Sequence, residues 1–323
     1  MTDEILLSVI VTVYNLEEYL PKTLESVLSI PAELPYEVIA VDDGSRDRSP
    51  EILRACEAEN DRMRVIIQEN SGASGARNTG IEAARGKYVT FVDGDDTIIP
   101  EFFPAVVREA EENGYDIVEG NIRYVTGDTL RFRAPDCERC ESAETPQLME
   151  WFFGRTETLT FNATAKLFRR AIIGDTRFLR EYRIGEDMKF DFEILLKKPK
   201  VLITGEDAYN YIDRDTSVLH SQYVERGWDA IRVLDSFREV EGFTDTPRVR
   251  MQLQKLKTDI LVMIYNTAVL TGKDPGKALA EVRKYRLSEF REALSQKEWA
   301  KLCLLQKSPA LYNYLLKKVK NAQ

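Results

Sequence analysis

The first hundred residues alternate between apolar runs typical of buried strands and stretches with helical spacing. Runs rich in aliphatic and β-branched residues predict four strands, at residues 6–13, 36–41, 64–67 and 88–92, and the first of them carries no charge. Between them, apolar residues at helical spacing predict helices over 20–28, from Ser49 onward and over 73–84. Ser49 is the expected cap of its helix, and Pro50 the first helical residue. Strict alternation predicts a parallel sheet with helices on both faces and ligands at the carboxyl ends of its strands.

After Pro100 the pattern is mixed. It predicts helices over 102–113 and 186–196, and short strands at 115–119, 201–204 and 208–211. The polar stretch 126–146 predicts a hairpin or a surface loop. From about residue 225 onward almost every segment has helical spacing, with breaks at 242–247 and 272–276. We therefore expect three regions, with bounds 1–100, 101–224 and 225–323.

Composition and charge exclude several classes of protein. The 323 residues are 43% hydrophobic, and the formal net charge is −9, which argues against a nucleic-acid binder. Cys137 and Cys140 form one C-x-x-C without the second pair of ligands that a structural zinc site needs, which favours a plain loop. The N-terminus lacks the basic stretch of a signal peptide, and no apolar run approaches the roughly 20 residues of a membrane span. These features predict a cytoplasmic protein.

Two acidic clusters follow two of the predicted strands. Asp42 and Asp43 close the second strand, and Asp93, Asp95 and Asp96 close the fourth. Aspartate and glycine are common turn residues, so one such cluster has a plain structural explanation. Two of them at one sheet edge place five carboxylates together despite their mutual repulsion. Such clusters hold a hard divalent cation or accept hydrogen bonds from sugar hydroxyls.

A segment rich in small residues lies after the third strand, over residues 70–80. Its small side chains let the backbone approach a ligand closely. Arg77 within it suits a phosphate group or an aspartate partner. The glycine spacing differs from the dinucleotide fingerprint, and no Gly-Lys-Ser/Thr of a P-loop occurs.

Taken together, these motifs resemble the family-2 glycosyltransferases over roughly residues 5–220. The matching motifs are Ser8 to Asn15, Val41 to Ser45, Gly75 to Gly80 and Phe91 to Asp96. The resemblance implies the glycosyltransferase-A fold, an α/β fold with a Rossmann-like, mostly parallel central sheet flanked by helices, here with a helical C-terminal extension. Residues 1–100 would bind a nucleotide sugar, and residues 101–224 would form the acceptor-binding half of the same catalytic domain.

The resemblance also implies which residues bind the nucleotide base. Thr12 and Tyr14 would form the wall of the base pocket, with Tyr14 stacked on uracil. Asp43 would accept the imide hydrogen of uracil, with Asp42 beside it as support.

A metal site is implied at the D-x-D sequence. Asp95 would contact Mn²⁺ or Mg²⁺ directly, and Asp93 would contact the ribose, the metal or a metal-bound water. The cation would bridge the two phosphates of the donor and stabilise the leaving diphosphate. Arg77 and Asn78 would organise the carboxylates. His220 is a candidate third ligand, although a lone histidine is more often structural.

The acceptor side has its own signature, at Lys166 to Arg170 and at Gly185-Glu186-Asp187. The resemblance places the catalytic base at Asp187, with Glu186 next in line. Two acids at a helix start also compensate the helix dipole, so a structural role is the alternative. Arg214 and Ser217 fit phosphate binding or a lid over the donor, or else an exposed loop.

The expected activity is inverting transfer of a sugar from a nucleotide diphosphate sugar. UDP-hexose or UDP-N-acetylhexosamine is the expected donor and a glycan or lipid-linked molecule the acceptor, in cell-surface polysaccharide biosynthesis. One alternative is a sugar-phosphate nucleotidyltransferase, which the acidic segment Tyr14 to Glu18 opposes. Another is a non-catalytic nucleotide-sugar-binding scaffold, which the intact Asp95 and Asp187 oppose.

The tail reverses the sign of the chain's charge. From Lys297 onward Glu298 is the only acid, among leucine and aromatic residues and several lysines, including Lys301, Lys307, Lys317, Lys318 and Lys320. Lysines beside apolar residues suit a helix lying on an anionic inner membrane surface. Packing on the catalytic domain and a homodimer contact are the alternatives. Pro309 is expected to split the stretch into two helices.

Overall fold

The computed structural model describes residues 4–126, 129–133, 139–154, 159–212, 223–240, 242–243 and 245–320. The chain divides into two compact units. Unit 1 comprises residues 1–148, 156–181 and 186–214, and unit 2 comprises residues 149–155, 182–185 and 215–323.

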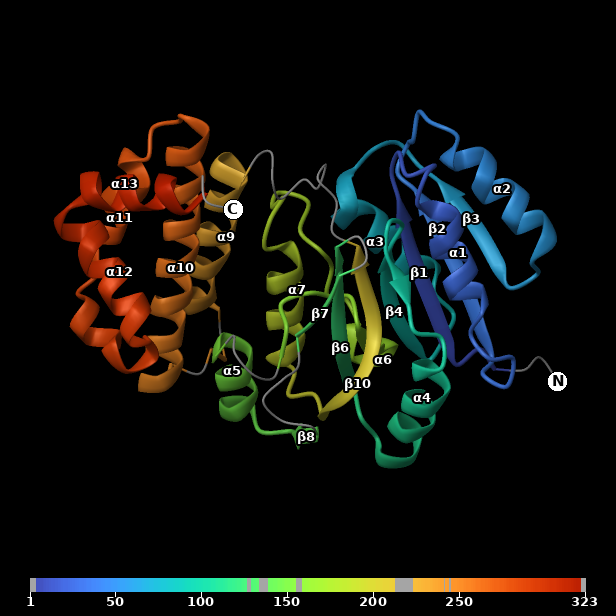
Figure 1. Ribbon diagram of the computed structural model, residues 1–323. Coiled ribbons are helices and arrows are strands. Elements are labelled where there is room, and N and C mark those ends of the chain that lie inside the picture. Colours follow the sequence, from blue (N-terminus) through green and yellow to red (C-terminus); the bar gives the residue numbers. More distant parts are fainter. Residues whose placement is uncertain are drawn as a thin grey trace. The chain divides into compact units, whose positions relative to one another are not determined.

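Unit 1 is built on one mixed sheet (Figure 1), whose main path runs β3-β2-β1-β4-β9-β6-β10-β5. The first four strands along this path are mutually parallel: β3 (Met63–Ile67), β2 (Tyr36–Asp42), β1 (Leu7–Val13) and β4 (Tyr88–Asp93). β9 (Lys166–Arg169) is antiparallel to both β4 and β6 (Ile117–Thr126). β10 (Val201–Ile212) runs parallel to β6, and three short strands pair antiparallel with these two, β5 (Thr97–Ile98), β7 (Thr129–Arg133) and β8 (Arg139–Ser142).

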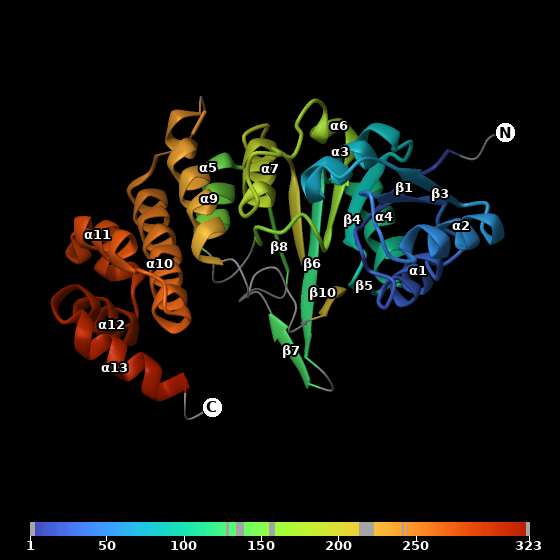
Figure 2. The same cartoon turned by 90° about the horizontal axis from the view of Figure 1, so that it is seen from above.

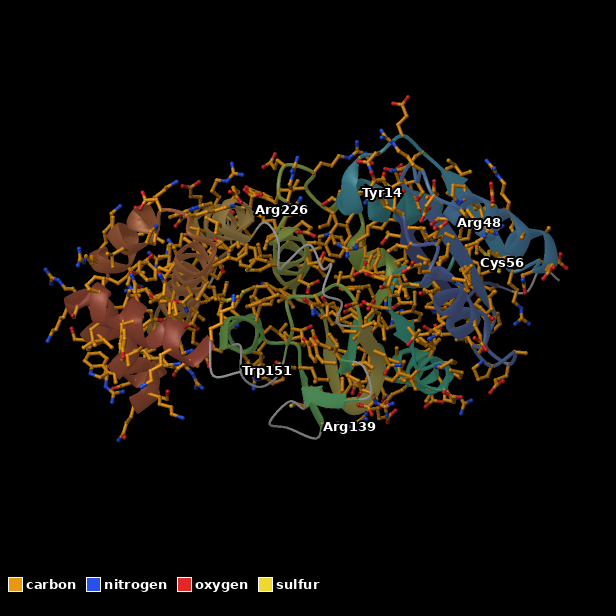
Figure 3. The ribbon with its side chains drawn as sticks, turned by 45° about the horizontal axis from the view of Figure 1, so that its top comes forward. Tyr14, Arg48, Cys56, Arg139, Trp151 and Arg226 are labelled. Carbon is orange, nitrogen blue, oxygen red and sulfur yellow. The ribbon has the colours of Figure 1, made fainter. Side chains whose placement is uncertain are left out.

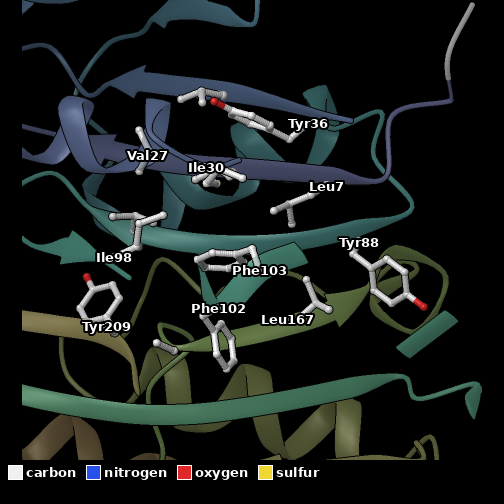
Figure 4. Packing of buried hydrophobic residues seen from close by; sticks show 14 of the residues in the cluster. Leu7, Val27, Ile30, Tyr36, Tyr88, Ile98, Phe102, Phe103, Leu167 and Tyr209 are labelled. Atoms are coloured by element: carbon white, nitrogen blue, oxygen red, sulfur yellow. The ribbon is translucent and has the colours of Figure 1, made fainter. Parts of the chain in front are cut away.

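Helices cover both faces of this sheet (Figure 2). On one face lie α1 (Leu20–Leu28), α2 (Ser49–Glu59) and α4 (Phe102–Asn113), whose apolar residues join one core with the side chains of β1 (Figure 4). α3 (Gly72–Ala83) covers the other face so closely that a Cβ at Gly80 would lie 2.3 Å from Ile10. α7 (Glu186–Leu195) packs there too, because the ring of Phe190 lies 5.9 Å from that of Phe91 on β4, which is in register with Ile10. α6 (Arg170–Ile173) is a single turn after β9.

The structure confirms the predicted α/β fold and corrects some details. Ser49 is the first helical residue of α2 rather than its cap, because its hydroxyl accepts the N–H of Leu16 at 2.9 Å. The two short strands predicted at 201–204 and 208–211 are one strand, β10, with register shifts between Ile203 and Tyr209 that interrupt the apolar pattern. The polar stretch 126–146 contains the predicted hairpin, β6–β7, and also β8 and the start of α5 (Thr145–Gly154), which the pattern did not predict.

Unit 2 is helical, as the pattern predicts (Figure 1). Its helices are α9 (Tyr223–Ser236), α10 (Pro247–Thr271), α11 (Gly276–Lys284), α12 (Gln296–Lys307) and α13 (Pro309–Lys320), with 3-10 turns η1 (Phe237–Glu239) and η2 (Leu287–Ala293). Thr246 caps α10 by accepting the N–H of Val249, and Gly272 ends it in the left-handed conformation. Among the described helices none is long and apolar enough to cross a bilayer.

Candidate active site

The sheet brings three of the predicted site segments to one edge. In the parallel register Val13 lies opposite Asp42, and Thr12 lies opposite Asp93. β1 therefore ends between the two acidic clusters, as expected for the carboxyl ends of neighbouring parallel strands. The hydroxyl of Thr12 donates to Oδ1 of Asp93 at 3.3 Å.

Tyr14 stands just beyond the end of β1 with 46% of its surface exposed (Figure 3). The next residue, Asn15, adopts a left-handed backbone with φ of 54°. Its N–H donates to Ser45 Oγ at 2.9 Å, and its Oδ1 accepts the N–H of Arg46 at 2.8 Å. The loops after β1 and β2 are thus tied together beside an exposed aromatic ring, an arrangement suited to stacking on a flat base.

The two aspartates after β2 have different surroundings. Oδ1 of Asp43 accepts the N–H of Ser71 and Oδ2 accepts that of Gly72, both at 2.8 Å. Asp43 therefore holds the first turn of α3, where a carboxylate also compensates the helix dipole. Asp42 is fully buried, and its Oδ1 has no hydrogen-bond partner among the described residues. The predicted bond between Asp43 and a uracil imide stays a prediction, and Asp42 offers an unpaired oxygen at the same edge.

The D-x-D turn after β4 is held from two sides. Thr23 of α1 donates its hydroxyl to the carbonyls of Gly94 and Asp96, at 3.0 and 2.7 Å. A Cβ at position 94 would lie 2.8 Å from the Thr12 carbonyl oxygen, so the turn requires glycine there. Asp96 is buried and accepts the hydroxyl of Tyr209 at 2.7 Å. Burial, together with the charges of Asp93 and Asp95, raises the pKa of Asp96 to about 8.

Arg77 is the centre of the site. It is 4% exposed and donates from Nη1 to Oδ1 of Asp187 at 2.6 Å and from Nη2 to Oδ1 of Asp93 at 2.9 Å. Glu186 Oε1 lies 3.6 Å from Nη1. One guanidinium therefore joins the end of β4 to the first turn of α7, and Arg77 and Asp187 are 110 residues apart in sequence.

Burial and charge act in opposite directions on these groups. Burial lowers the pKa of Arg77, but the charges of Asp187, Asp93 and Glu186 outweigh it, so the net shift is upward and the guanidinium stays charged. Burial and the charge of Asp187 raise the pKa of Glu186 to about 7, against the opposing effect of Arg77. Burial also raises the pKa of Asp187, although Arg77 lowers it in part. The pair is thus poised closer to neutral pH than ordinary carboxyl groups are.

Asn78 is connected to Arg77 through Phe178. Its amide group makes two hydrogen bonds to the backbone of Phe178, both at 2.8 Å. The ring of Phe178 lies 5.3 Å from the Arg77 guanidinium carbon, within the range of a cation–π contact. Asn78 is thus linked to the Arg77 guanidinium through Phe178, and its role in organising the carboxylates stays a prediction.

A second contact fixes Asp187 from outside its helix. Ala163 donates its N–H to Oδ2 of Asp187 at 3.2 Å, while Oδ1 accepts from Arg77. Sequence reasoning missed Ala163, and it missed Thr23 and Tyr209 as well. Nothing in an alanine, a helix threonine or a strand tyrosine distinguishes them in the sequence.

The donor set at the D-x-D turn fits a hard cation. Asp95 and Asp93 are each part-exposed at the sheet edge and offer carboxylate oxygens. Within the described ranges no group of three or more His, Cys, Asp or Glu side chains could by itself hold a metal ion. Mg²⁺ is commonly held by one or two carboxylates plus substrate phosphates, so this set would need the nucleotide to complete it. Three further predicted residues lie outside the described residues: Arg214, Ser217 and His220.

The sequence and the fold both have known counterparts. Residues 8–177 match the family described as Glycosyl transferase family 2. The chain is 33% identical over 221 residues to the uncharacterized glycosyltransferase EpsJ of Bacillus subtilis (strain 168), covering 68% of this chain and 64% of EpsJ. It is 29% identical over 230 residues to the poly(ribitol-phosphate) beta-glucosyltransferase of Bacillus spizizenii, covering 68% of this chain and 34% of that enzyme. The chain thus matches less than two thirds of the length of either relative.

Among solved structures, the fold resembles S. aureus TarS 1–349. The complex of that protein with UDP superposes with a TM-score of 0.65 at 19% identity, covering 98% of this chain and 92% of TarS 1–349. Its complex with UDP-GlcNAc gives a TM-score of 0.62 at 20% identity with the same coverage. The likeness confirms the expected fold.

Proposed function

This chain belongs to glycosyl transferase family 2, and from that premise we propose that it is an inverting glycosyltransferase whose donor is a UDP-sugar. The observation that carries the proposal is the bridge made by Arg77. Its guanidinium holds Asp93 of the D-x-D turn and Asp187 of α7 together. A donor-side carboxylate and a candidate base are thereby fixed on one side chain.

The proposed donor site lies at the ends of β1, β2 and β4. Tyr14 offers an exposed ring for the base, and Asp42 or Asp43 offers an acceptor for the imide hydrogen. Asp95, with Asp93, would hold a divalent cation. When bound, the cation would neutralise charge on the two phosphates of the leaving diphosphate. TarS, which shares the fold, has been crystallised with UDP and with UDP-GlcNAc, and this supports a uridine donor.

Asp187 is the proposed general base. It would take the proton of the acceptor hydroxyl as that oxygen attacks the anomeric carbon and the bond to the diphosphate breaks, which inverts the configuration. Its raised pKa favours this role because a base works best when its pKa lies near the operating pH. The contacts from Arg77 and Ala163 orient the carboxylate. Asp187 lies in the first turn of α7, at the N-terminus of the helix.

The proposed acceptor is a glycan or a lipid-linked molecule of a cell-surface polysaccharide. Relatives support this class by name, since they include the poly(ribitol-phosphate) beta-glucosyltransferase and the succinoglycan biosynthesis protein ExoO of Rhizobium meliloti (strain 1021). ExoO is 31% identical over 217 residues.

The test is a thermal-shift panel of nucleotide diphosphate sugars with and without Mn²⁺, followed by hydrolysis of the donors that bind. We expect UDP-sugars to raise the melting temperature only with the cation and to be hydrolysed slowly. Binding without hydrolysis or transfer would instead identify a scaffold protein. Formation of a nucleotide sugar from UTP and a sugar 1-phosphate would identify a nucleotidyltransferase, and either result would overturn the proposal.

A further inference from the structure

The last helix, α13, presents apolar side chains to solvent. Leu311, Tyr314, Leu315 and Val319 are between 43% and 63% exposed. Their spacing places them on one side of the helix, together with Lys318. The other side packs within unit 2, because Tyr312 is buried and donates its hydroxyl to Asn266 Oδ1 of α10 at 3.1 Å. α13 lies with α11 and α12 along one side of α10 (Figure 2). We call the exposed side, Leu311, Tyr314, Leu315, Lys318 and Val319, the α13 face.

Positive charge lies within this face and beside it. Residues 297–323 contain six lysines and one acid, in a chain whose net charge is −9. The acid, Glu298, lies 3.1 Å from the ammonium group of Lys255, which also donates to Asp259. Lys317, Lys318 and Lys320 are exposed on α13 itself. Lys318 lies within the α13 face and Lys317 lies one turn beyond Tyr314, so the face combines apolar side chains with positive charge along one edge.

We propose that the α13 face binds the surface of an anionic lipid bilayer. Apolar side chains on one side of a helix enter the boundary between headgroups and acyl chains, and neighbouring lysines pair with anionic headgroups. Lys318 can lie within the α13 face because its aliphatic stem packs on apolar surface while its ammonium group reaches the headgroups. A second copy of the chain is a poorer occupant, since a two-fold contact brings the same surface of both copies together and would place two cationic patches in one interface.

The test is sedimentation of the full chain with vesicles of phosphatidylglycerol or of phosphatidylcholine, at low salt. One variant, Tyr314→Ser/Leu315→Ser, removes the centre of the face, and another, Lys317→Glu/Lys318→Glu, reverses its charge. The matched control, Lys22→Glu/Ile67→Ser, changes an exposed lysine and a 45% exposed isoleucine in unit 1. All the substituted side chains are exposed, so each variant should fold.

We expect the parent and the control to sediment with phosphatidylglycerol and not with phosphatidylcholine. Each α13 variant should bind at least about tenfold more weakly, since a lysine near such a surface strengthens binding about fivefold. Equal binding by parent and α13 variants would overturn the proposal. A parent that stays in the supernatant with phosphatidylglycerol vesicles would also overturn it. If that parent is a dimer in analytical ultracentrifugation without vesicles, and Tyr314→Ser/Leu315→Ser makes it monomeric, the α13 face is a dimer contact.

A second inference comes from a different place, the buried ammonium of Lys166 in unit 1. Lys166 is 2% exposed and donates to the carbonyls of Thr160 and Asn162, at 2.7 and 2.8 Å. It also donates to Asp191, one helical turn beyond Asp187 on α7, and lies 3.5 Å from Glu119. One ammonium therefore fixes both α7 and the segment that ends at Ala163.

That segment carries the N–H that reaches the proposed base. Glu119 accepts the N–H of Thr160 at 2.8 Å, so both ends of this short stretch are held from the sheet side. Ala163 then donates to Asp187. We infer that Lys166 is a positioning residue, which sets the orientation of the Asp187 carboxylate through Ala163 and α7. The inference rests on the proposed role of Asp187.

The test uses Lys166→Met/Asp191→Asn, which removes one charge of each sign and keeps the side-chain shapes. Asp191→Asn alone removes only the negative charge from the contact with α7, and it covers the case in which the double variant fails to fold. Lys197→Met is the matched control, because Lys197 also donates to two carbonyls, those of Ile172 and Ile173, without a link to Asp187. The readouts are kcat, the KM for the donor and the affinity for UDP.

We expect the double variant to lose at least about tenfold in kcat, since small misplacements of a reacting group are costly. Asp191→Asn should lose less, and both should keep the donor KM and the UDP affinity within about twofold, because Lys166 does not reach the donor side. The control should match the parent. Folded variants with the parent's kcat would overturn the inference and leave the base assignment intact. Full turnover by Asp187→Asn would instead remove the proposed function and this inference together.

Discussion

Two buried basic side chains in unit 1, Arg77 and Lys166, each contact several carboxylates. Each of these two clusters includes an aspartate of α7, and the two aspartates lie one helical turn apart. Arg77 holds Asp93 and Asp187, whose side chains are 35% and 19% exposed. Lys166 holds Glu119 and Asp191, which are 2% and 4% exposed. Both clusters combine one basic side chain with carboxylates, but only the carboxylates around Arg77 are partly exposed to solvent.

The difference in exposure separates a group that can react from a group that can only hold others in place. Carboxylates that reach the surface can meet a substrate or a cation, and they can exchange protons. Those around Lys166 have no such access, and burial raises the pKa of Asp191 to about 7 although the ammonium of Lys166 opposes that shift. We therefore assign chemistry to the Arg77 group and positioning to the Lys166 group.

The largest effect on stability is expected from Lys166→Met. The substitution leaves the buried Asp191 carboxylate without the ammonium that donates to it, and breaking a buried pair in this way typically costs about 3–5 kcal/mol in the free energy of unfolding. Chemical denaturation of the parent and the variant measures it. A loss below about 1 kcal/mol would show that water reaches this group and would remove the contrast with Arg77.

Asp95→Ala should remove the metal-dependent part of donor binding. A ligand at a hundredfold excess over its dissociation constant stabilises the folded state by about 2.7 kcal/mol. We expect the variant to lose the Mn²⁺-dependent part of that stabilisation by UDP, measured against its own ligand-free form. The parent in the presence of a chelator is the matched control. Unchanged UDP stabilisation in either sample would contradict the metal assignment.

Arg77→Leu should be the milder of the two cation deletions for folding. Its carboxylates can take up water or protons, so we expect a loss of about 1–3 kcal/mol in the free energy of unfolding, less than for Lys166→Met. Transfer activity should nevertheless disappear, because Asp93 and Asp187 lose their common partner. Denaturation curves and transfer assays on the same preparations check both parts, and a larger loss of stability than in Lys166→Met would reverse the comparison.

The smallest effect is a shift in pH dependence. Asp187 must be deprotonated to act as a base, and burial raises its pKa, so activity should fall on acidification at a pH above the ordinary carboxyl range of about 4. Glu186 has a pKa raised to about 7 and titrates together with Asp187. Glu186→Gln removes a neighbouring negative charge, which lowers the pKa of Asp187 and moves the acidic limb to lower pH. An acidic limb that moves to higher pH in Glu186→Gln would show that the charge of Glu186 does not raise the pKa of Asp187.

Much of the fold and of the donor edge was predictable from the sequence. β-branched runs and helical spacing predicted the four parallel strands, and this topology places Asp42 and Asp93 on either side of β1. The bulged strand β10 was not predictable, because its polar interruption mimics a turn. The contacts that hold the site were also out of reach, since Tyr209 and Asp96 are 113 residues apart and a strand tyrosine has no distinctive pattern.

The central claim is that Asp187 is the base of the Arg77 group, and one comparison tests it most directly: the rate of sugar transfer by Asp187→Asn against the parent, with UDP affinity measured on the same samples. The substitution keeps the shape of the side chain and removes its basicity. We predict that transfer falls at least about a hundredfold while UDP binding is retained, because general-base catalysis contributes factors of this size. Near-parental transfer by a folded Asp187→Asn variant would contradict the claim and make Glu186 the next candidate.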